Sequence, residues 1–265
     1  MSSLSRFRLI TFAMTDTLIK FRTAPGKLYG EIGALFGVSN NENHDLVAKF
    51  KINWHHMNTT HPIFGQKSNI DEKEWWRLLI KGTFDHHNLS DEKINNVTNY
   101  LLDLYKTSSC WVVTFGAVDF LKYLDTQKFL DNRTHDSEQQ IKLGVISNFD
   151  SRLEVLMKNM KLSEYFDFSL SSYEAGFEKP SREIFTKAMR RSGIKDLKPY
   201  ECLHIGNTPI TDYLGARNAG WSSILVHDKM PNQLKEKYGE IIETHHVYNN
   251  LLDLHRSIVD HRIKW

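Results

Sequence analysis

Polar side chains that could bind an anion follow short apolar segments of this chain. Ser147 and Asn148 stand at the end of one such segment, and Lys179 lies just before a predicted helix. Asn207 follows another apolar segment, and Asp212 lies five residues further on. An ammonium group supplies positive charge, and a hydroxyl with nearby backbone N–H groups supplies directional donors. These residue types predict an anion site, and phosphate is the anion that we expect there.

The elements that must position these side chains are strands alternating with helices. Apolar runs of strand length cover residues 9–12, 143–147, 166–170, 202–206 and 223–226. Helical patterns separate them, such as the one that starts at Ser181 and ends by Gly193. This alternation predicts an α/β fold with a Rossmann-like parallel sheet and helices on both faces. Because ligands bind at the carboxyl ends of the strands in such a sheet, we expect the polar residues to converge there.

A helical segment separates the first predicted strand from the others. Apolar residues at helical spacing indicate four amphipathic helices in series, and Trp54, Trp75 and Trp76 are expected to hold them together. We expect residues 21–110 to form a four-helix-bundle cap, inserted into an α/β core of residues 1–20 and 111–265. The polar stretch 125–142 is expected to be an irregular surface excursion.

The strand-end residues resemble the motifs of the haloacid dehalogenase (HAD) superfamily, a group of mostly magnesium-dependent phosphatases. Nearly the whole chain is similar to the HAD-like proteins typified by the insect rhythmically-expressed-gene-2 protein. Six stretches carry the resemblance: SLSRFRLITF, FRTAPGKLYGEIGALFG, LYKTSSCW, KLGVISNFDSRL, EKPSREIFTKAM and ECLHIGNTPITDYLGARNAGW. The resemblance implies the HAD core with its inserted cap.

The resemblance also implies a role for each residue of the predicted anion site. Ser147 matches the hydroxyl residue that binds the transferring phosphoryl group, and Asn148 directly follows it. Lys179 matches the lysine that balances the charge of the nucleophile and the phosphate. Ser147, Asn148 and Lys179 are therefore the expected phosphate-binding residues.

Three catalytic positions depart from the family pattern. The resemblance places a nucleophilic aspartate at Ala13 and an acid–base aspartate at Thr15. It places acidic magnesium ligands at Asn207 and Asp212, of which only Asp212 keeps its carboxylate. The metal site made by Thr15, Asn207 and Asp212 is therefore degenerate, since a hard cation needs charged oxygen ligands.

The joint departures predict a pseudoenzyme. A methyl group cannot attack phosphorus, so Ala13 removes covalent catalysis by the expected route. Thr15 cannot shuttle a proton near neutral pH, a role that contributes about 10²–10⁴-fold in rate. We expect no resident cofactor and weak or absent magnesium binding. The expected partner is a phosphorylated small molecule, or another protein that docks on the helical cap.

Other hypotheses remain open. The chain could be a weakly active or rewired magnesium-dependent phosphomonoester hydrolase with Asp16 as its nucleophile, although a misplacement of about 1 Å can already lower the rate ~10²-fold. Lys179 and Asp212 could form an ion pair without a ligand. Ala13 could also have been introduced into an active parent, which Asn207 argues against because one nucleophile change would have sufficed.

Composition excludes several classes of partner. The formal net charge is +2 without a basic stripe, so we expect no nucleic-acid binding. Two cysteines and the lack of a long apolar run favour an intracellular, cytoplasmic or nuclear protein without a membrane span. The adjacent histidine pairs 55–56, 86–87 and 245–246 are expected on the solvated surface rather than around zinc, because neighbouring residues on a helix point in different directions.

Overall fold

The computed structural model describes residues 4–38, 43–84, 89–132 and 141–265 of the chain. Its internal contacts divide the chain into two compact units. The first, called the sheet unit below, comprises Met1–Lys20, Val113–Asn148 and Lys161–Trp265. The second, called the helical unit, comprises Phe21–Val112 and Phe149–Met160. One boundary between the units thus directly follows Asn148, a predicted phosphate-binding residue.

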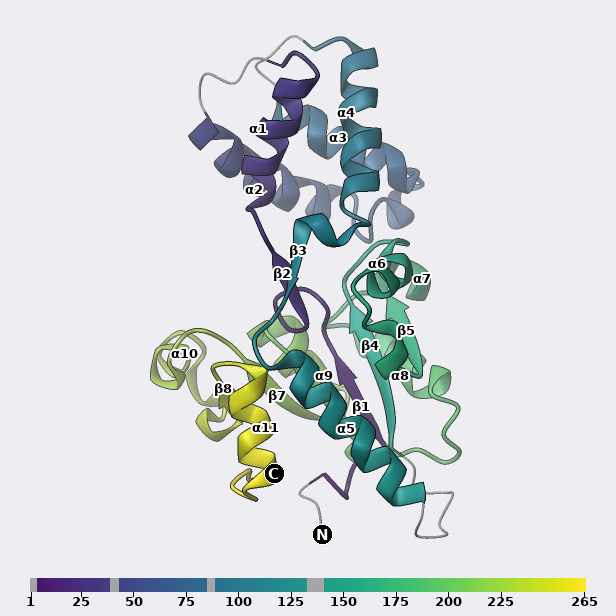
Figure 1. Ribbon diagram of the computed structural model, residues 1–265, viewed down its shortest axis with the longest axis vertical. Helices are drawn as coiled ribbons and strands as arrows, with labels where there is room; N and C mark the ends of the chain where they lie inside the picture. Colours follow the sequence, from purple (N-terminus) through teal and green to yellow (C-terminus); the bar gives the residue numbers. More distant parts are fainter. Residues whose placement is uncertain (1–3, 39–42, 85–88, 133–140) are drawn as a thin grey trace. The chain divides into compact units, whose positions relative to one another are not determined.

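A six-stranded sheet forms the centre of the sheet unit (Figure 1). Its strand order is β5 (Phe168–Ser171), β4 (Lys142–Ser147), β1 (Leu9–Phe12), β6 (Cys202–Gly206), β7 (Ser222–Val226) and β8 (Val247–Tyr248). Each neighbouring pair runs parallel. The carboxyl ends of the strands therefore lie along one edge, and the predicted α/β, Rossmann-like fold is confirmed.

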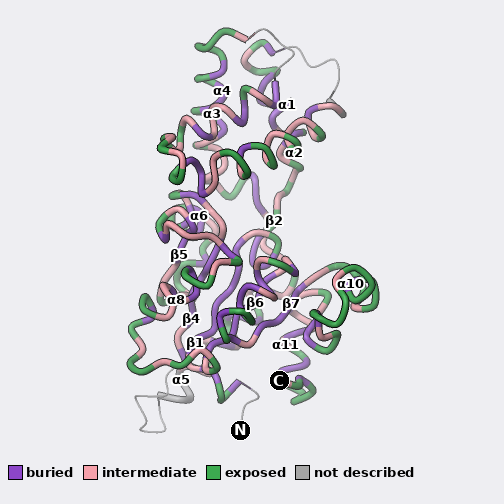
Figure 2. Tube along the Cα trace, turned by 180° about the vertical axis from the view of Figure 1, so that it is seen from behind, coloured by how far each residue is buried: buried purple, intermediate pink, exposed green. Residues whose placement is uncertain are grey.

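Helices cover both faces of this sheet. They are α5 (Ala117–Asn132), α7 (Ser172–Ala175), α8 (Arg182–Arg191), α9 (Gly215–Asn218), α10 (Pro231–Tyr238) and α11 (Leu251–Val259). Leu9 of β1 packs in a buried cluster with residues of α8 and α9, whereas Phe12 contacts Phe120 of α5 edge-on. All four residues of β1 are fully buried, as expected for a strand covered on both faces. Figure 2 shows the buried strands in purple and the mostly exposed α10 in green.

Helix α5 is longer than the sequence predicted. It continues to Asn132, so the expectation of irregular structure from residue 125 is wrong over that part. Residues 133–140 lie outside the described residues, and β4 begins at Lys142. The helix can continue without many apolar residues because its outer face is solvated, as at Thr126, whose hydroxyl donates to Lys122 O at 3.0 Å.

The helical unit contains, among the described residues, α1 (Pro25–Leu35), α2 (Asn43–Thr60), α3 (Glu72–Thr83), α4 (Asp91–Leu104) and α6 (Leu153–Asn159). Helix α1 packs against α2 and α4, and α3 also packs against α2 and α4. The chain enters and leaves this unit through the paired strands β2 (Ile19–Phe21) and β3 (Trp111–Val113). None of the described helices has the length and apolarity that a membrane span requires.

Aromatic packing holds the helical unit together, as the sequence predicted. Trp75 is fully buried, and its ring centroid lies 5.6 Å from that of Trp54 and 5.1 Å from that of Trp76. Trp76 Nε1 also donates to Asp150 Oδ2 at 3.0 Å, and Arg152 lies over the Trp76 ring at 4.7 Å. These contacts explain why Phe149–Met160 clusters with the helical unit rather than with the core to which the sequence assigned it.

Candidate functional site

The predicted site begins at Ala13, directly after β1. Phe12 pairs with Val145 of β4 and with Ile205 of β6. The Ala13 N–H donates to Ile205 O at 2.9 Å, and the residue is only 4% exposed. Ala13 thus lies at the carboxyl edge of the sheet, between the ends of β4 and β6. At this place the chain presents a methyl group, which offers neither a lone pair nor an acidic proton.

A tight turn places Asp16 beyond Ala13. Met14 O accepts a hydrogen bond from Ile19 N at 3.1 Å, and the Asp16 N–H donates to Ile19 O at 2.6 Å. Asp16 has a φ of 58°, a left-handed conformation that aspartate adopts more readily than most residues. The turn displaces the Asp16 carboxylate from the position of Ala13.

A buried ion pair occupies the centre of the predicted site. Lys179 Nζ lies 2.6 Å from Asp212 Oδ1 and donates to Ile146 O at 2.7 Å. Both side chains are buried. Asn148 is tied to the same segment, since its Nδ2 donates to Lys179 O at 2.9 Å and its Oδ1 accepts from Lys179 N at 2.7 Å. Ser147, between Ile146 and Asn148, is also buried, so the structure brings these four predicted residues into one region.

The carboxylate of Asp212 is engaged within the protein on both oxygens. Oδ2 accepts from Asn207 N at 3.0 Å and from Thr208 N at 2.8 Å, while Oδ1 faces Lys179. Burial by itself would raise the pKa of Asp212, but the Lys179 ammonium and a hydrogen bond to His204 hold this pKa well below its usual range. Asp212 is therefore ionised at neutral pH.

His204 completes this network, and the sequence analysis missed it. The ring is fully buried in β6, with Nδ1 at 2.9 Å from Thr11 Oγ1 and Nε2 at 3.3 Å from Asp212 Oδ1. Burial and the neighbouring Lys179 ammonium lower the pKa of His204 to about 4, so the imidazole is neutral at pH 7. A polar residue inside an otherwise apolar predicted strand was the signal that could have identified it.

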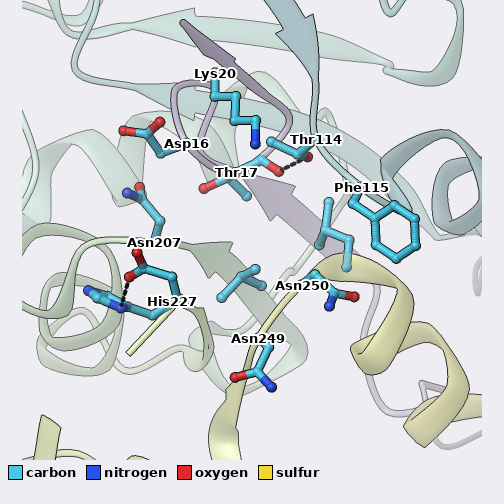
Figure 3. Close-up of a pocket in the computed structure, with 12 residues that line it drawn as sticks. Asp16, Thr17, Lys20, Thr114, Phe115, Asn207, His227, Asn249 and Asn250 are labelled. Atoms are coloured by element: carbon cyan, nitrogen blue, oxygen red, sulfur yellow. Dashed lines mark hydrogen bonds and ion pairs between the residues drawn. The ribbon is translucent and has the colours of Figure 1, made fainter. Parts of the chain in front are cut away.

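A polar cavity of about 530 Å³ lies at the same edge of the sheet unit (Figure 3). Of the predicted site residues, Asp16 and Asn207 line it, whereas Ser147, Asn148 and Lys179 are not among its lining residues. Asn207 connects the cavity to the buried network, since its backbone N–H binds Asp212. The sequence analysis therefore identified residues of two adjoining places rather than of one open site.

Other cavity residues were not predicted, among them Lys20, His227, Asn249 and Asn250. The two asparagines follow β8, a two-residue strand too short to recognise by its apolar pattern. Asp16 is solvent-exposed, yet surrounding protein atoms remove part of its hydration and raise its pKa, an effect that Lys20 opposes. The cavity thus combines amide, carboxylate, ammonium and imidazole groups.

The fold described above is that of a HAD-like hydrolase. A model of the haloacid dehalogenase-like hydrolase family matches residues 7–220, so the chain belongs to this family. It is 50% identical over 269 residues to the Rhythmically expressed gene 2 protein of Drosophila melanogaster, with 100% of both chains covered. It is 29% identical to haloacid dehalogenase-like hydrolase domain-containing protein 3 of Xenopus laevis, over 86% of this chain and 87% of that protein.

Solved structures support the fold. The magnesium-bound HAD-hydrolase YfnB of Bacillus subtilis superposes with a TM-score of 0.64 at 17% identity, covering 96% of this chain and 99% of that chain. L-2-haloacid dehalogenase of Xanthobacter autotrophicus gives a TM-score of 0.63 at 16% identity, covering 96% and 98%. At such identities the likeness establishes the fold alone.

Proposed function

We propose that this HAD-family protein is a pseudoenzyme that binds a phosphorylated small molecule in the cytoplasm without hydrolysing it. The observation that carries the proposal is the position of Ala13, which follows β1 at the carboxyl edge of the sheet, 4% exposed, where the family pattern places its nucleophile. A methyl group cannot form the covalent phosphoryl intermediate. The expected reaction therefore has no first step.

The charges around Ala13 favour binding of an anion without a metal. In the pattern that the chain resembles, four acidic residues surround the phosphate; three of these positions are here the uncharged Ala13, Thr15 and Asn207. The remaining pair, Lys179 with Asp212, has no net charge. Each missing carboxylate therefore removes a repulsion between its own negative charge and that of the phosphate. For two unit charges 4 Å apart, at an effective dielectric constant of 20, this repulsion is about 4 kcal/mol.

The residues present do not fit magnesium. Mg²⁺ keeps a near-octahedral oxygen shell and is usually held by one or two carboxylates. Asp212 is the only carboxylate left among the four family positions, and its oxygens already accept hydrogen bonds from Asn207 N and Thr208 N and face Lys179. Binding a metal there would require Asp212 to give up partners that it holds while fully buried.

The ligand's phosphate is proposed to lie near Ser147, Asn148 and Lys179, and the rest of the ligand in the adjoining cavity. Asn207 supports this placement because it borders both places. The amide and imidazole groups of the cavity suit a polar, hydrogen-bonding ligand of small-molecule size. Docking of a protein partner on the helical unit is the other form of this proposal, although the tryptophans there pack mainly on one another.

Stabilisation by ligand tests this proposal. The full chain in EDTA is unfolded with urea in the presence of inorganic phosphate or an aryl phosphate. A ligand at a hundredfold excess over its Kd should add about 2.7 kcal/mol to the free energy of unfolding. Ser147→Ala should lose most of this gain, whereas Ser163→Ala, an exposed serine on a surface turn, should keep it. Equal gains in both variants, or no gain in the unchanged chain, would contradict the proposal.

One observation favours a second function. Asp16, the alternative nucleophile, lines the cavity, so its carboxylate would be accessible to a phosphate ester bound there. A rewired hydrolase that uses Asp16 predicts a measurable release of phosphate that Asp16→Ala abolishes. If the unchanged chain releases no phosphate, this second function is excluded and the binding role stands.

A further inference from the structure

A cluster of one carboxylate and two imidazoles precedes β8 in the sheet unit. Glu243 Oε2 lies 3.3 Å from His245 Nε2 and 3.9 Å from His246 Nδ1. Suitable ligand atoms of all three residues lie within 4.8 Å of one another. Neither the proposed phosphate site nor the cavity at the sheet edge uses these residues. The cluster therefore calls for its own explanation.

The backbone brings the two rings together. His245 and His246 lie on a single 3₁₀ turn (Thr244–His246) that leads directly into β8, not on an α-helix. Their ring centroids are 4.3 Å apart. His246 is only 5% exposed, so the prediction that this pair is solvated surface is wrong for His246. That prediction assumed helical geometry, which the turn does not have. The exposed pair at 55–56 agrees with it, and 86–87 lies outside the described residues.

The imidazole of His246 is oriented as a metal ligand would be. Its Nε2 lies 3.0 Å from Lys264 O, which can only accept a hydrogen bond, so Nε2 carries the proton. Nδ1 is then the atom that carries the lone pair, and it lies 3.9 Å from Glu243 Oε2. Metal-binding histidines usually donate their other N–H to a carbonyl or carboxylate in this way. A metal at Nδ1 would replace the hydrogen bond that this atom accepts from Tyr213 Oη at 3.0 Å.

The carboxylate of Glu243 is held from its other side. Arg217 lies 2.6 Å from Oε1, which leaves Oε2 directed toward the two histidines. Hydrogen bonds to the distal oxygen of a ligating carboxylate are common in metal sites. The Arg217 charge opposes a cation, so affinity must come from the coordinating imidazoles and Oε2 rather than from net negative charge.

We propose that Glu243 Oε2, His245 Nε2 and His246 Nδ1 bind a divalent transition-metal ion of the Zn²⁺ class. Two imidazoles and one carboxylate are a ligand set that zinc uses, with bond lengths of roughly 2.0–2.2 Å and tetrahedral geometry. Such bonds require ligand atoms about 3.3–3.6 Å apart, close to the 3.3 and 3.9 Å observed. The longer distance, between Glu243 Oε2 and His246 Nδ1, must shorten by a few tenths of an ångström on binding, and water fills the fourth position.

The three ligands lie on one segment, residues 243–246, which contacts two other segments of the sheet unit. Glu243 and His246 already contact Tyr213 Oη, and Tyr213 directly follows Asp212 of the buried network. His246 also binds the C-terminal segment through Lys264 O. Metal binding would therefore stabilise the turn that leads into β8, independently of whether the protein binds phosphate.

Metal titration of the full chain tests the site. After EDTA treatment and removal of the chelator, Zn²⁺ is titrated by calorimetry, and Co²⁺ binding is followed by its visible absorption. We expect one ion per chain with micromolar affinity and a four-coordinate Co²⁺ spectrum.

The decisive comparison uses two exposed histidines. His245→Ala should weaken Zn²⁺ binding at least ~tenfold without unfolding the chain, since the His245 side chain is half-exposed. His56→Ala, on the exposed face of α2, should bind as the unchanged chain does. Equal binding by the unchanged chain and His245→Ala, or no stoichiometric binding at all, would overturn the assignment. Thermal unfolding should give a Zn²⁺-dependent increase in Tm that only His245→Ala loses.

Discussion

Protonation of the buried His204 should destabilise the folded protein. The folded-state pKa is lowered to about 4, whereas an unfolded histidine has a pKa of about 6.5. Because the unfolded chain takes up the proton first as pH falls, the stability that neutral His204 contributes is complete above about pH 6.5 and is lost between ~6.5 and ~4. At one pKa unit per 1.36 kcal/mol, the loss is about 2 kcal/mol between pH 8 and pH 5, and about 3 kcal/mol below pH 4.

Urea unfolding at pH 8 and pH 5 measures this loss. His204→Gln retains a polar side chain near Asp212 but cannot titrate, so between these pH values it should lose about 2 kcal/mol less than the unchanged chain. His55→Gln, on an exposed part of α2, should behave as the unchanged chain does. If His204→Gln and the unchanged chain lose the same free energy, the ring is not neutral in the folded state. The description of a closed Lys179, Asp212 and His204 network would then be refuted.

Two further substitutions address the same region. Lys179→Met leaves the Asp212 carboxylate buried without its cation and should lower the free energy of unfolding by about 3–5 kcal/mol. In the same urea assay, Lys195→Met at an exposed site should change this free energy by less than about 0.5 kcal/mol. Ala13→Asp should weaken metal-free phosphate binding at least ~tenfold by calorimetry, because it returns a like charge to the site. A small effect of Lys179→Met, or unchanged phosphate affinity in Ala13→Asp, would contradict these expectations.

The sheet could be predicted because its strands are nearly continuous apolar runs. Residues 9–12 and 202–206 were predicted with the bounds that the structure shows, since both faces of these strands are covered and apolar residues predominate in them. The convergence of Asn148, Lys179 and Asp212 followed from the rule that the carboxyl ends of parallel strands share an edge.

Features that depend on long-range side-chain contacts could not be predicted. Phe149–Met160 joins the helical unit because Asp150 and Arg152 bind Trp76, a pairing across more than 70 residues that no local pattern reveals. The burial of Lys179 also hides its charge within an ion pair, so residue type alone did not distinguish an open phosphate site from a closed network. The open cavity depends on loops after β7 and β8, whose positions are set by tertiary packing.

The most direct test of the pseudoenzyme proposal is phosphate release from an aryl phosphate with Mg²⁺. The unchanged chain is compared with Ala13→Asp combined with Asn207→Asp, which restores two of the missing carboxylates. We predict no turnover by the unchanged chain and a measurable, EDTA-sensitive rate for the double variant. Turnover by the unchanged chain that EDTA stops would contradict the proposal and make Asp16 the next residue to substitute.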